Sequence, residues 1–210
     1  MARGRLITIE GIDGAGKTTL AAALLDHLRG SGIEIELLRE PGGVVVAEKI
    51  RTLVKDPALT IGARAETLLY AAARAQLVEE ALLPVLERGT WVLLDRFVDS
   101  SLAYQGAGRG LGVELVRAIN EFGTGGLTPD RTLLLEIDPA LGRARQGTRL
   151  EGFDRLELEQ EEFFATIAAA YAALADAEPE RVRRIDASQS AELVVAAAEA
   201  AVEDLLAGRD

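Results

Sequence analysis

Gly11-Ile12-Asp13-Gly14-Ala15-Gly16-Lys17-Thr18-Thr19 is the stretch that decides the fold of this 210-residue chain. It fits the pattern G-x-x-x-x-G-K-[ST], in which backbone N–H groups of a glycine-rich turn cradle the phosphates of a nucleotide. Lys17 would place a positive charge near the β- and γ-phosphates, and the Thr18 hydroxyl would reach a Mg²⁺ ion. We therefore expect residues 11–19 to bind a nucleoside triphosphate.

The residues on both sides of this turn supply the context that the pattern requires. Residues 6–9 are apolar and partly β-branched, which indicates a buried strand. After the turn, apolar residues recur at helical spacing, at Leu20, Leu24, Leu25 and Leu28. The alternative, a glycine-rich turn that merely precedes a helix, leaves this order of strand, turn and helix unexplained.

The rest of the chain alternates strands with helices. We expect further strands at residues 33–38, 91–94, 131–137 and 182–185, and helices at 46–54, 63–86, 113–122, 157–175 and 191–206. A glycine-rich passage at 106–112 should interrupt the helical pattern. The alternation predicts an α/β fold of the three-layer P-loop NTPase type, with a five-stranded, mainly parallel sheet flanked by helices. One domain over residues 1–210 suits the length, with a short, arginine-rich mobile lid at about 143–156.

Composition excludes several classes of protein. No apolar run approaches the roughly 18–20 residues that span a membrane, and cysteine is absent, which excludes disulfides and thiolate metal sites. His27 is the only histidine, so a catalytic triad or metal cage built on histidines is excluded. The net charge of −11 argues against partners such as nucleic acids or anionic membranes. No signal peptide is visible, so we expect a cytoplasmic protein.

Polar residues follow each predicted strand, where parallel α/β sheets bind their ligands. They stand at 11–18, 39–43, 95–97, 138 and 186–188. Asp95 ends an apolar strand and is expected to hold Mg²⁺, directly or through water, unless it only caps the next helix. Arg96 is expected to clamp a phosphate rather than to form a surface ion pair.

Three further groups have more than one interpretation. Tyr70 and Arg74 share a helix face and would sandwich a base, unless the tyrosine is half-buried and the arginine exposed. Asp13 would hold metal-bound water, accept a hydrogen bond from a sugar hydroxyl, or only shape the loop. The arginines of the expected lid would either stabilise a transferring phosphoryl group or stay solvated; they are Arg143, Arg145, Arg149 and Arg155.

In this order and spacing, the chain resembles the thymidylate kinase family of the bacterial type. The resemblance is carried by residues 11–19, Arg39-Glu-Pro-Gly-Gly43, Tyr70-Ala-Ala-Ala-Arg74, Asp95-Arg-Phe97 and Ser100-Ser-Leu-Ala-Tyr-Gln-Gly106, and it continues to Ile185-Asp-Ala-Ser188. The first motif indicates only nucleotide binding, whereas the others together are far more specific. The resemblance covers essentially the whole chain.

The resemblance implies transfer of the γ-phosphoryl group of ATP to dTMP, giving dTDP and ADP. It implies that Tyr70 stacks on thymine, that Arg74 hydrogen-bonds the base and that Tyr104 crowds the sugar 2′ position. It assigns to the same acceptor site Arg39, Glu40, Arg96, Ser101 and Gln105. It also implies that four residues lie near the adenine or the phosphates of ATP: Arg145, Asp186, Ala187 and Ser188.

The resemblance also bears on catalysis and assembly. Relatives of one type carry a catalytic arginine inside the phosphate loop, at the position of Gly14 here. The cation is therefore expected from the lid, and we take Arg149 as the catalytic lid residue with Lys17, Asp13 and Arg96, although the choice among the lid arginines stays open. The resemblance suggests a homodimer, for which helices 63–86 and 113–122 would supply the face.

Two other functions stay open on the residues alone. The first is a kinase for another nucleoside monophosphate or for a deoxynucleoside, and the second is a P-loop switch or regulatory ATPase. A monophosphate is already largely anionic at pH 7 and needs no general base, whereas an alcohol would need one, for which Asp13 or Glu40 is available. A regulatory ATPase would leave the lid arginines and the Tyr70–Arg74 face without a purpose.

Overall fold

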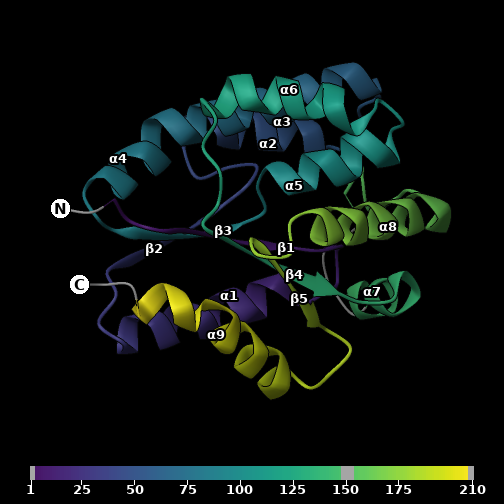
Figure 1. Ribbon diagram of the computed structural model, residues 1–210. Helices are drawn as coiled ribbons and strands as arrows, with labels where there is room; N and C mark the ends of the chain where they lie inside the picture. The colour runs from purple at the N-terminus through teal and green to yellow at the C-terminus, as the bar shows by residue number, and fades with distance from the viewer. Residues whose placement is uncertain (1–2, 148–153, 208–210) are drawn as a thin grey trace.

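Five short strands form one sheet in the computed structural model, which describes residues 3–147 and 154–207 (Figure 1). The strands are β1 (Leu6–Glu10), β2 (Ile35–Arg39), β3 (Trp91–Asp95), β4 (Arg131–Glu136) and β5 (Val182–Asp186). Their order is β2-β3-β1-β4-β5, and every pairing among them is parallel. The predicted α/β fold with a five-stranded sheet is confirmed.

The inner strands are buried along almost their whole length. The side chains of β1 are all buried, and those of β3 and β4 are buried except at the last residue. Helices cover both faces of a parallel sheet, so these strands are continuous apolar runs rather than alternating ones. Two polar side chains inside the sheet satisfy one another: Thr8 and Thr132 are hydrogen-bonded at 2.8 Å.

Helices form the two outer layers. They are α1 (Lys17–Gly30), α2 (Val45–Lys55), α3 (Ala63–Leu77), α4 (Leu83–Glu87), α5 (Val98–Ser101), α6 (Val113–Thr124), α7 (Pro139–Gln146), α8 (Glu161–Ala177) and α9 (Ala191–Ala207), with π-helical turns η1 (Val78–Leu82) and η2 (Leu102–Gly108). In Figure 1, α1 and α9 lie together below the sheet, and α3, α5, α6 and α8 lie above it. None of the described helices is both long and apolar enough to cross a membrane.

The glycine-rich passage interrupts the helical pattern as the sequence predicts, between η2 and α6. Helix η2 continues through Gly106 and ends only at Gly108. Both glycines are packing positions, because an added Cβ would lie 3.1 Å from Cα of Val113 at Gly106 and 2.7 Å from the Phe163 ring at Gly108. Gly106 and Gly108 therefore let η2 approach α6 and α8, and the predicted interruption falls at residues 109–112 of the passage.

A second correction concerns the segment expected to form a mobile loop. Residues 143–146 are the end of α7, which Asp138 caps by accepting hydrogen bonds from the backbone N–H groups of Ala140 and Leu141 at 2.9 and 3.3 Å. Pro139 opens the helix, where its missing N–H costs nothing. The following helix begins at Glu161 rather than at 157. Arg149 belongs to residues 148–153, which lie outside the described part of the chain.

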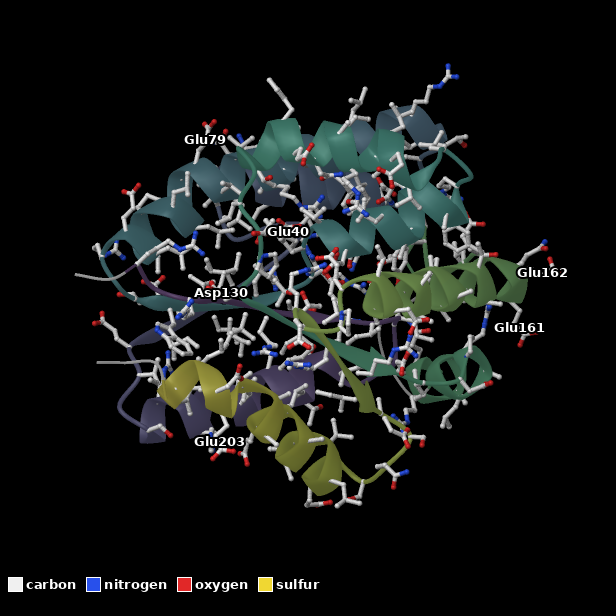
Figure 2. The ribbon with its side chains drawn as sticks, in the orientation of Figure 1. Glu40, Glu79, Asp130, Glu161, Glu162 and Glu203 are labelled. Carbon is white, nitrogen blue, oxygen red and sulfur yellow. The ribbon has the colours of Figure 1, made fainter. Side chains whose placement is uncertain are left out.

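The acidic side chains behind the net charge of −11 project mainly outward. Figure 2 shows Glu79, Glu161, Glu162 and Glu203 at the periphery, and all four are exposed. Glu40 lies in the middle of the molecule and is buried. The four exposed carboxylates therefore face solvent rather than the interior of the molecule.

Candidate active site

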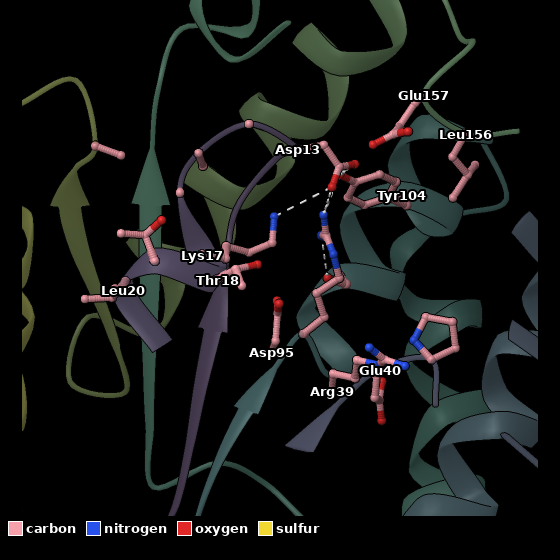
Figure 3. Close-up of a pocket in the computed structure, with 18 of the residues that line it drawn as sticks. Asp13, Lys17, Thr18, Leu20, Arg39, Glu40, Asp95, Tyr104, Leu156 and Glu157 are labelled. Atoms are coloured by element: carbon pink, nitrogen blue, oxygen red, sulfur yellow. Dashed lines mark hydrogen bonds and ion pairs between the residues drawn. The ribbon is translucent and has the colours of Figure 1, made fainter. Parts of the chain in front are cut away.

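A cavity of about 540 Å³ opens at the carboxyl ends of β1, β2 and β3 (Figure 3). This edge of the sheet is where doubly wound folds bind ligands. Of the residues singled out from sequence, the cavity is lined by Asp13, Gly14, Ala15, Gly16, Lys17, Thr18, Thr19, Arg39, Glu40, Tyr70, Arg74, Asp95, Arg96, Ser101, Tyr104, Gln105, Arg145 and Ala187. Four others line a second cavity behind the loop instead: Gly11, Ile12, Asp186 and Ser188.

The phosphate loop packs directly against the backbone of α7. Gly14 has a φ of +81°, and a Cβ added there would lie 2.1 Å from the carbonyl oxygen of Gly142. In the reverse direction, a Cβ on Gly142 would lie 2.9 Å from the carbonyl oxygen of Asp13. Position 14 therefore has no room for the arginine that some thymidylate kinases carry in this loop.

Lys17 is buried at the base of the loop. Its Nζ donates to the carbonyl oxygens of Gly11 and Ile12 at 3.1 and 2.9 Å and lies 3.7 Å from the Asp13 carboxylate. Burial and the neighbouring Arg96 charge lower the pKa of Lys17 to about 8. An anion bound in the loop would favour the protonated form and raise that pKa.

Arg96 joins the turn after β3 to the phosphate loop. Its Nη2 donates to Asp13 Oδ1 at 2.5 Å, and its Nη1 donates to the Gly11 carbonyl at 3.1 Å. Among the described non-glycine residues, Arg96 alone has a positive φ, of 71°. Such strain persists only where the surroundings enforce it, and it is concentrated at functional sites.

Asp13 is held in its ionised form by these contacts. Burial alone would raise its pKa, but the charges of Arg96 and Lys17 outweigh burial and hold the pKa well below its usual range. Tyr104 also donates its hydroxyl to Asp13 Oδ2 at 3.2 Å. Three roles were considered for Asp13, and these contacts support the one in which its carboxylate fixes the shape of the phosphate loop.

Arg74 is buried and fully engaged within the protein. Its guanidinium donates to Glu40 Oε2, Ser101 Oγ, Asn120 Oδ1 and the Phe97 carbonyl oxygen. All three nitrogens of Arg74 thus have protein acceptors, and the alternative of an exposed arginine is wrong. A hydrogen bond from Arg74 to a base would require one of these acceptors to be released.

Two buried groups behind the acceptor side were not singled out from sequence. Asn120 comes from α6, far along the chain from Arg74. Glu66 is wholly buried one helical turn before Tyr70, and it accepts hydrogen bonds from Gln105 and Arg109 at 2.9 and 3.1 Å. The only sequence signal for Glu66 is its position four residues before Tyr70, on the same face of the helix.

The described arginines of the expected lid have different neighbours. Arg145 lines the cavity and donates to the Ala187 carbonyl at 2.9 Å. Arg143 instead donates to the Glu159 carbonyl at 3.1 Å. Arg155 forms an ion pair with Glu66 at 2.6 Å, away from the phosphate loop. Among the described lid arginines, Arg145 is therefore the one placed at the cavity.

The residues present fit a Mg²⁺ ion. Figure 3 shows the Asp95 side chain pointing into the cavity that Lys17 and Thr18 line. The Oδ1 atom of Asp95 is buried and has no hydrogen-bond partner among the described residues. No three acidic or histidine side chains of the described chain gather into a cage of their own. A carboxylate and a hydroxyl suit Mg²⁺ held mainly by phosphates and water.

The cavity wall also contains residues that the sequence analysis did not select. They are Pro41, Arg51, Lys55, Ser100, Asp154, Leu156 and Glu157, then Gln189 just before α9, and Ala191, Val194 and Val195 at the start of α9. The last three recur at helical spacing, but the same pattern is typical of any helix packed on a sheet. Periodicity therefore does not distinguish a ligand-facing patch from core.

Comparisons with known proteins concern nearly the whole chain. A family model described as thymidylate kinase matches residues 9–198. A thymidylate kinase of Lactobacillus delbrueckii subsp. bulgaricus is 50% identical over 198 residues, which cover 93% of this chain and 93% of the relative. One from Deinococcus radiodurans is 48% identical over 204 residues, covering 97% and 98%. One from Alkalilimnicola ehrlichii is 45% identical over 205 residues, covering 96% and 94%.

The contact between the phosphate loop and α7 is tested by paired substitutions. Gly14→Ala combines positive φ with a clash, whereas Gly16→Ala has positive φ alone, because nothing lies within 4 Å of a Cβ there. We expect Gly14→Ala to reduce the free energy of unfolding by about 1–3 kcal/mol more than Gly16→Ala does. Denaturant unfolding without nucleotide measures the difference. Equal losses would show that α7 does not hold the loop.

Proposed function

Because the chain belongs to the thymidylate kinase family, we infer that it transfers the γ-phosphoryl group of ATP to dTMP and releases dTDP and ADP. One observation carries the proposal beyond the family. A single cavity is lined both by the phosphate loop and by all eight residues expected to bind the acceptor. The product dTDP is the precursor from which dTTP is made.

The donor half is built on the phosphate loop. Backbone N–H groups of residues 13–19 and the Lys17 ammonium are proposed to hold the ATP phosphates. Arg145 and Ala187 are proposed to lie against the nucleotide, as expected for this side of the cavity. The apolar residues at the start of α9 would then give the adenine a wall, and they are Ala191, Val194 and Val195.

The acceptor half is built on β2, α3 and the turn after β3. Arg39 and Arg96 are proposed to hold the dTMP phosphate, and Tyr70 to stack on the thymine. Tyr104 is proposed to exclude a 2′-hydroxyl. This role is supported by its position, because its hydroxyl is held by Asp13 and its ring lies 5.2 Å from the Arg96 guanidinium.

The chemistry needs charge and alignment more than proton transfer. An oxygen of the dTMP phosphate forms the new bond to the γ-phosphorus, and the bond to the β–γ bridging oxygen breaks as ADP leaves. The attacking oxygen is already largely anionic at pH 7, because the second phosphate pKa is about 6. We propose that Lys17 and Arg96 neutralise the transferring group while Asp13 holds Arg96 in line.

Mg²⁺ is the proposed metal cofactor. Thr18 and Asp95 would hold it, directly or through water, and it would neutralise charge on the β- and γ-phosphate oxygens. The partnerless buried oxygen of Asp95 supports this assignment.

A further cation is proposed to come from residues 143–156, acting as a lid within a single domain of residues 1–210. Position 14 of the phosphate loop cannot supply this cation, because the contact of Gly14 with Gly142 leaves no room for a side chain. Arg149 stays the proposed catalytic lid residue, and Arg145 is proposed to contact ATP. Single alanine replacements of the lid arginines test this: loss of kcat at Arg145 but not at Arg149 would reassign the role.

The acceptor is tested by a panel of nucleosides and nucleoside monophosphates offered with ATP and Mg²⁺. We expect dTMP to give the highest kcat/KM, and excess EDTA to abolish turnover. Preference for another monophosphate or for a deoxynucleoside would refute the assignment, and rapid ATP hydrolysis without any acceptor would favour a regulatory ATPase. Activity that persists in EDTA would refute the proposed Mg²⁺ cofactor but not the assignment of dTMP as the acceptor.

We also propose a homodimer in the cytoplasm, where both nucleotide substrates are found. The exposed apolar side chains Leu68 of α3 and Leu115 and Phe122 of α6 support the face, and Phe122 is 93% exposed. Light scattering of the wild type should give twice the chain mass of 22.4 kDa, and Phe122→Glu should give one chain mass. Leu193→Glu, on exposed α9, is the control and should stay dimeric. A monomeric wild type would refute the proposal.

A further inference from the structure

Glu10 is a wholly buried carboxylate that stands outside the cavity wall. It is the last residue of β1, directly before the phosphate loop. It accepts hydrogen bonds from the backbone N–H of Phe97 at 2.7 Å, the hydroxyl of Ser100 at 2.6 Å and the hydroxyl of Tyr171 at 2.8 Å. One side chain thus joins the phosphate loop to the turn after β3, to α5 and to α8.

Two of the hydrogen bonds to Glu10 also hold Arg96 in position. The N–H of Phe97 belongs to the residue that follows Arg96, so its bond to Glu10 fixes the turn in which Arg96 holds its φ of 71°. The Ser100 oxygen that donates to Glu10 also accepts from Arg96 Nη1 at 3.2 Å. The backbone and the guanidinium of Arg96 are both linked to the same carboxylate.

A third path leads to Arg74. The carbonyl oxygen of Phe97 accepts a hydrogen bond from Arg74 Nη2 at 2.9 Å. Phe97 is therefore held by Glu10 at its N–H and holds Arg74 at its carbonyl. The buried guanidinium of Arg74 and the half-buried guanidinium of Arg96 are both positioned through the Arg96–Phe97 turn.

We propose that Glu10 is a positioning residue that sets the acceptor half of the site by fixing the Arg96–Phe97 turn against the phosphate loop. The proposal rests on the proposed function for the meaning of the acceptor half. Glu10 does not line the cavity, so it acts through Arg96 and Arg74 rather than by touching a substrate.

A purely structural role explains the carboxylate less well. Burial and the nearby Asp99 charge raise the pKa of Glu10 to about 7, so an ionised carboxylate is costly here, and a well-packed apolar residue usually serves a core at least as well. An apolar residue at position 10 would leave the Phe97 N–H unpaired and would release the turn. The three donors that converge on Glu10 are therefore the reason for an acid at this place.

The proposal is tested by Glu10→Gln, which keeps the shape and one acceptor oxygen for Phe97 but turns a donor toward Ser100 and Tyr171. Loss of a hydrogen bond to a charged group predicts a fall of about 10- to 100-fold in kcat/KM for dTMP. The KM for ATP should change less than about twofold, because the loop contacts of Lys17 do not involve Glu10. Equal losses for both substrates would overturn the proposal.

Asp99→Asn is the matched control. Asp99 is also a buried carboxylate, and its hydrogen-bond partners are Arg181 and Thr132, not the Arg96–Phe97 turn. The Asp99 charge raises the pKa of Glu10, so Asp99→Asn favours the ionised form of Glu10 and leaves the three donors to Glu10 in place. We expect Asp99→Asn to lower stability and to leave the KM for dTMP within about twofold of the wild type. A loss of dTMP affinity as large as that of Glu10→Gln would overturn the proposal.

Two milder variants keep the test valid if Glu10→Gln does not fold. Ser100→Ala removes the hydroxyl shared by Glu10 and Arg96, and Tyr171→Phe removes a hydroxyl that contacts Glu10 but not the Arg96 guanidinium. We expect Ser100→Ala to lower kcat/KM for dTMP without a matching change in the KM for ATP, and Ser100→Thr to restore kcat/KM. Tyr171→Phe should change kcat/KM for dTMP by less than about threefold. The reverse order would overturn the proposal.

One readout does not depend on turnover. Hydrogen exchange at the Phe97 amide and the Arg96 guanidinium, followed by ¹⁵N NMR of the free protein, should be slow in the wild type and faster in Ser100→Ala or Glu10→Gln. If the wild type does not phosphorylate dTMP, the proposed function fails and this readout still decides the role of Glu10. Unchanged exchange in every folded variant would overturn the inference alone.

Discussion

The ion pair between Arg96 and Asp13 is the interaction on which the rest of the site depends. It joins the turn after β3 to the phosphate loop after β1 at 2.5 Å. These two segments belong to adjacent parallel strands, so the sheet brings their ends together and the ion pair sets their final distance. In the proposed function Arg96 thereby lies between the donor phosphates and the acceptor, and its strained backbone is maintained by contacts on both sides.

Close packing also explains why the phosphate loop has glycine rather than arginine at position 14. Helix α7 touches the loop through Gly14 and Gly142, so position 14 has no room for a cationic side chain. Under the proposed function, further charge at the transferring phosphoryl group then comes from Arg96 and from a lid arginine. The close packing of two glycines thus connects the geometry of the loop with the need for a second source of positive charge.

Sequence reasoning predicted the sheet and most of the cavity because strand ends carry their motifs locally. Asp95, Arg96 and the 39–43 segment could be placed at one edge once the strands were recognised. The partners of Arg74 could not, since Asn120 and Ser101 approach it only through the tertiary packing of three helices. Glu10 lies just beyond the strand predicted at residues 6–9 and was not singled out, because no local pattern reveals which distant donors converge on a buried carboxylate.

The central claim is that one guanidinium serves both halves of the site, and Arg96→Lys measures it most directly. Lysine keeps the charge but loses the planar fork that reaches Asp13 and the Gly11 carbonyl together. Steady-state kinetics should show kcat reduced about 100-fold or more, with the Kd for ATP within about twofold of the wild type. A kcat near the wild-type value with only a raised KM for dTMP would contradict the account, because Arg96 would then bind the acceptor without aligning the transfer.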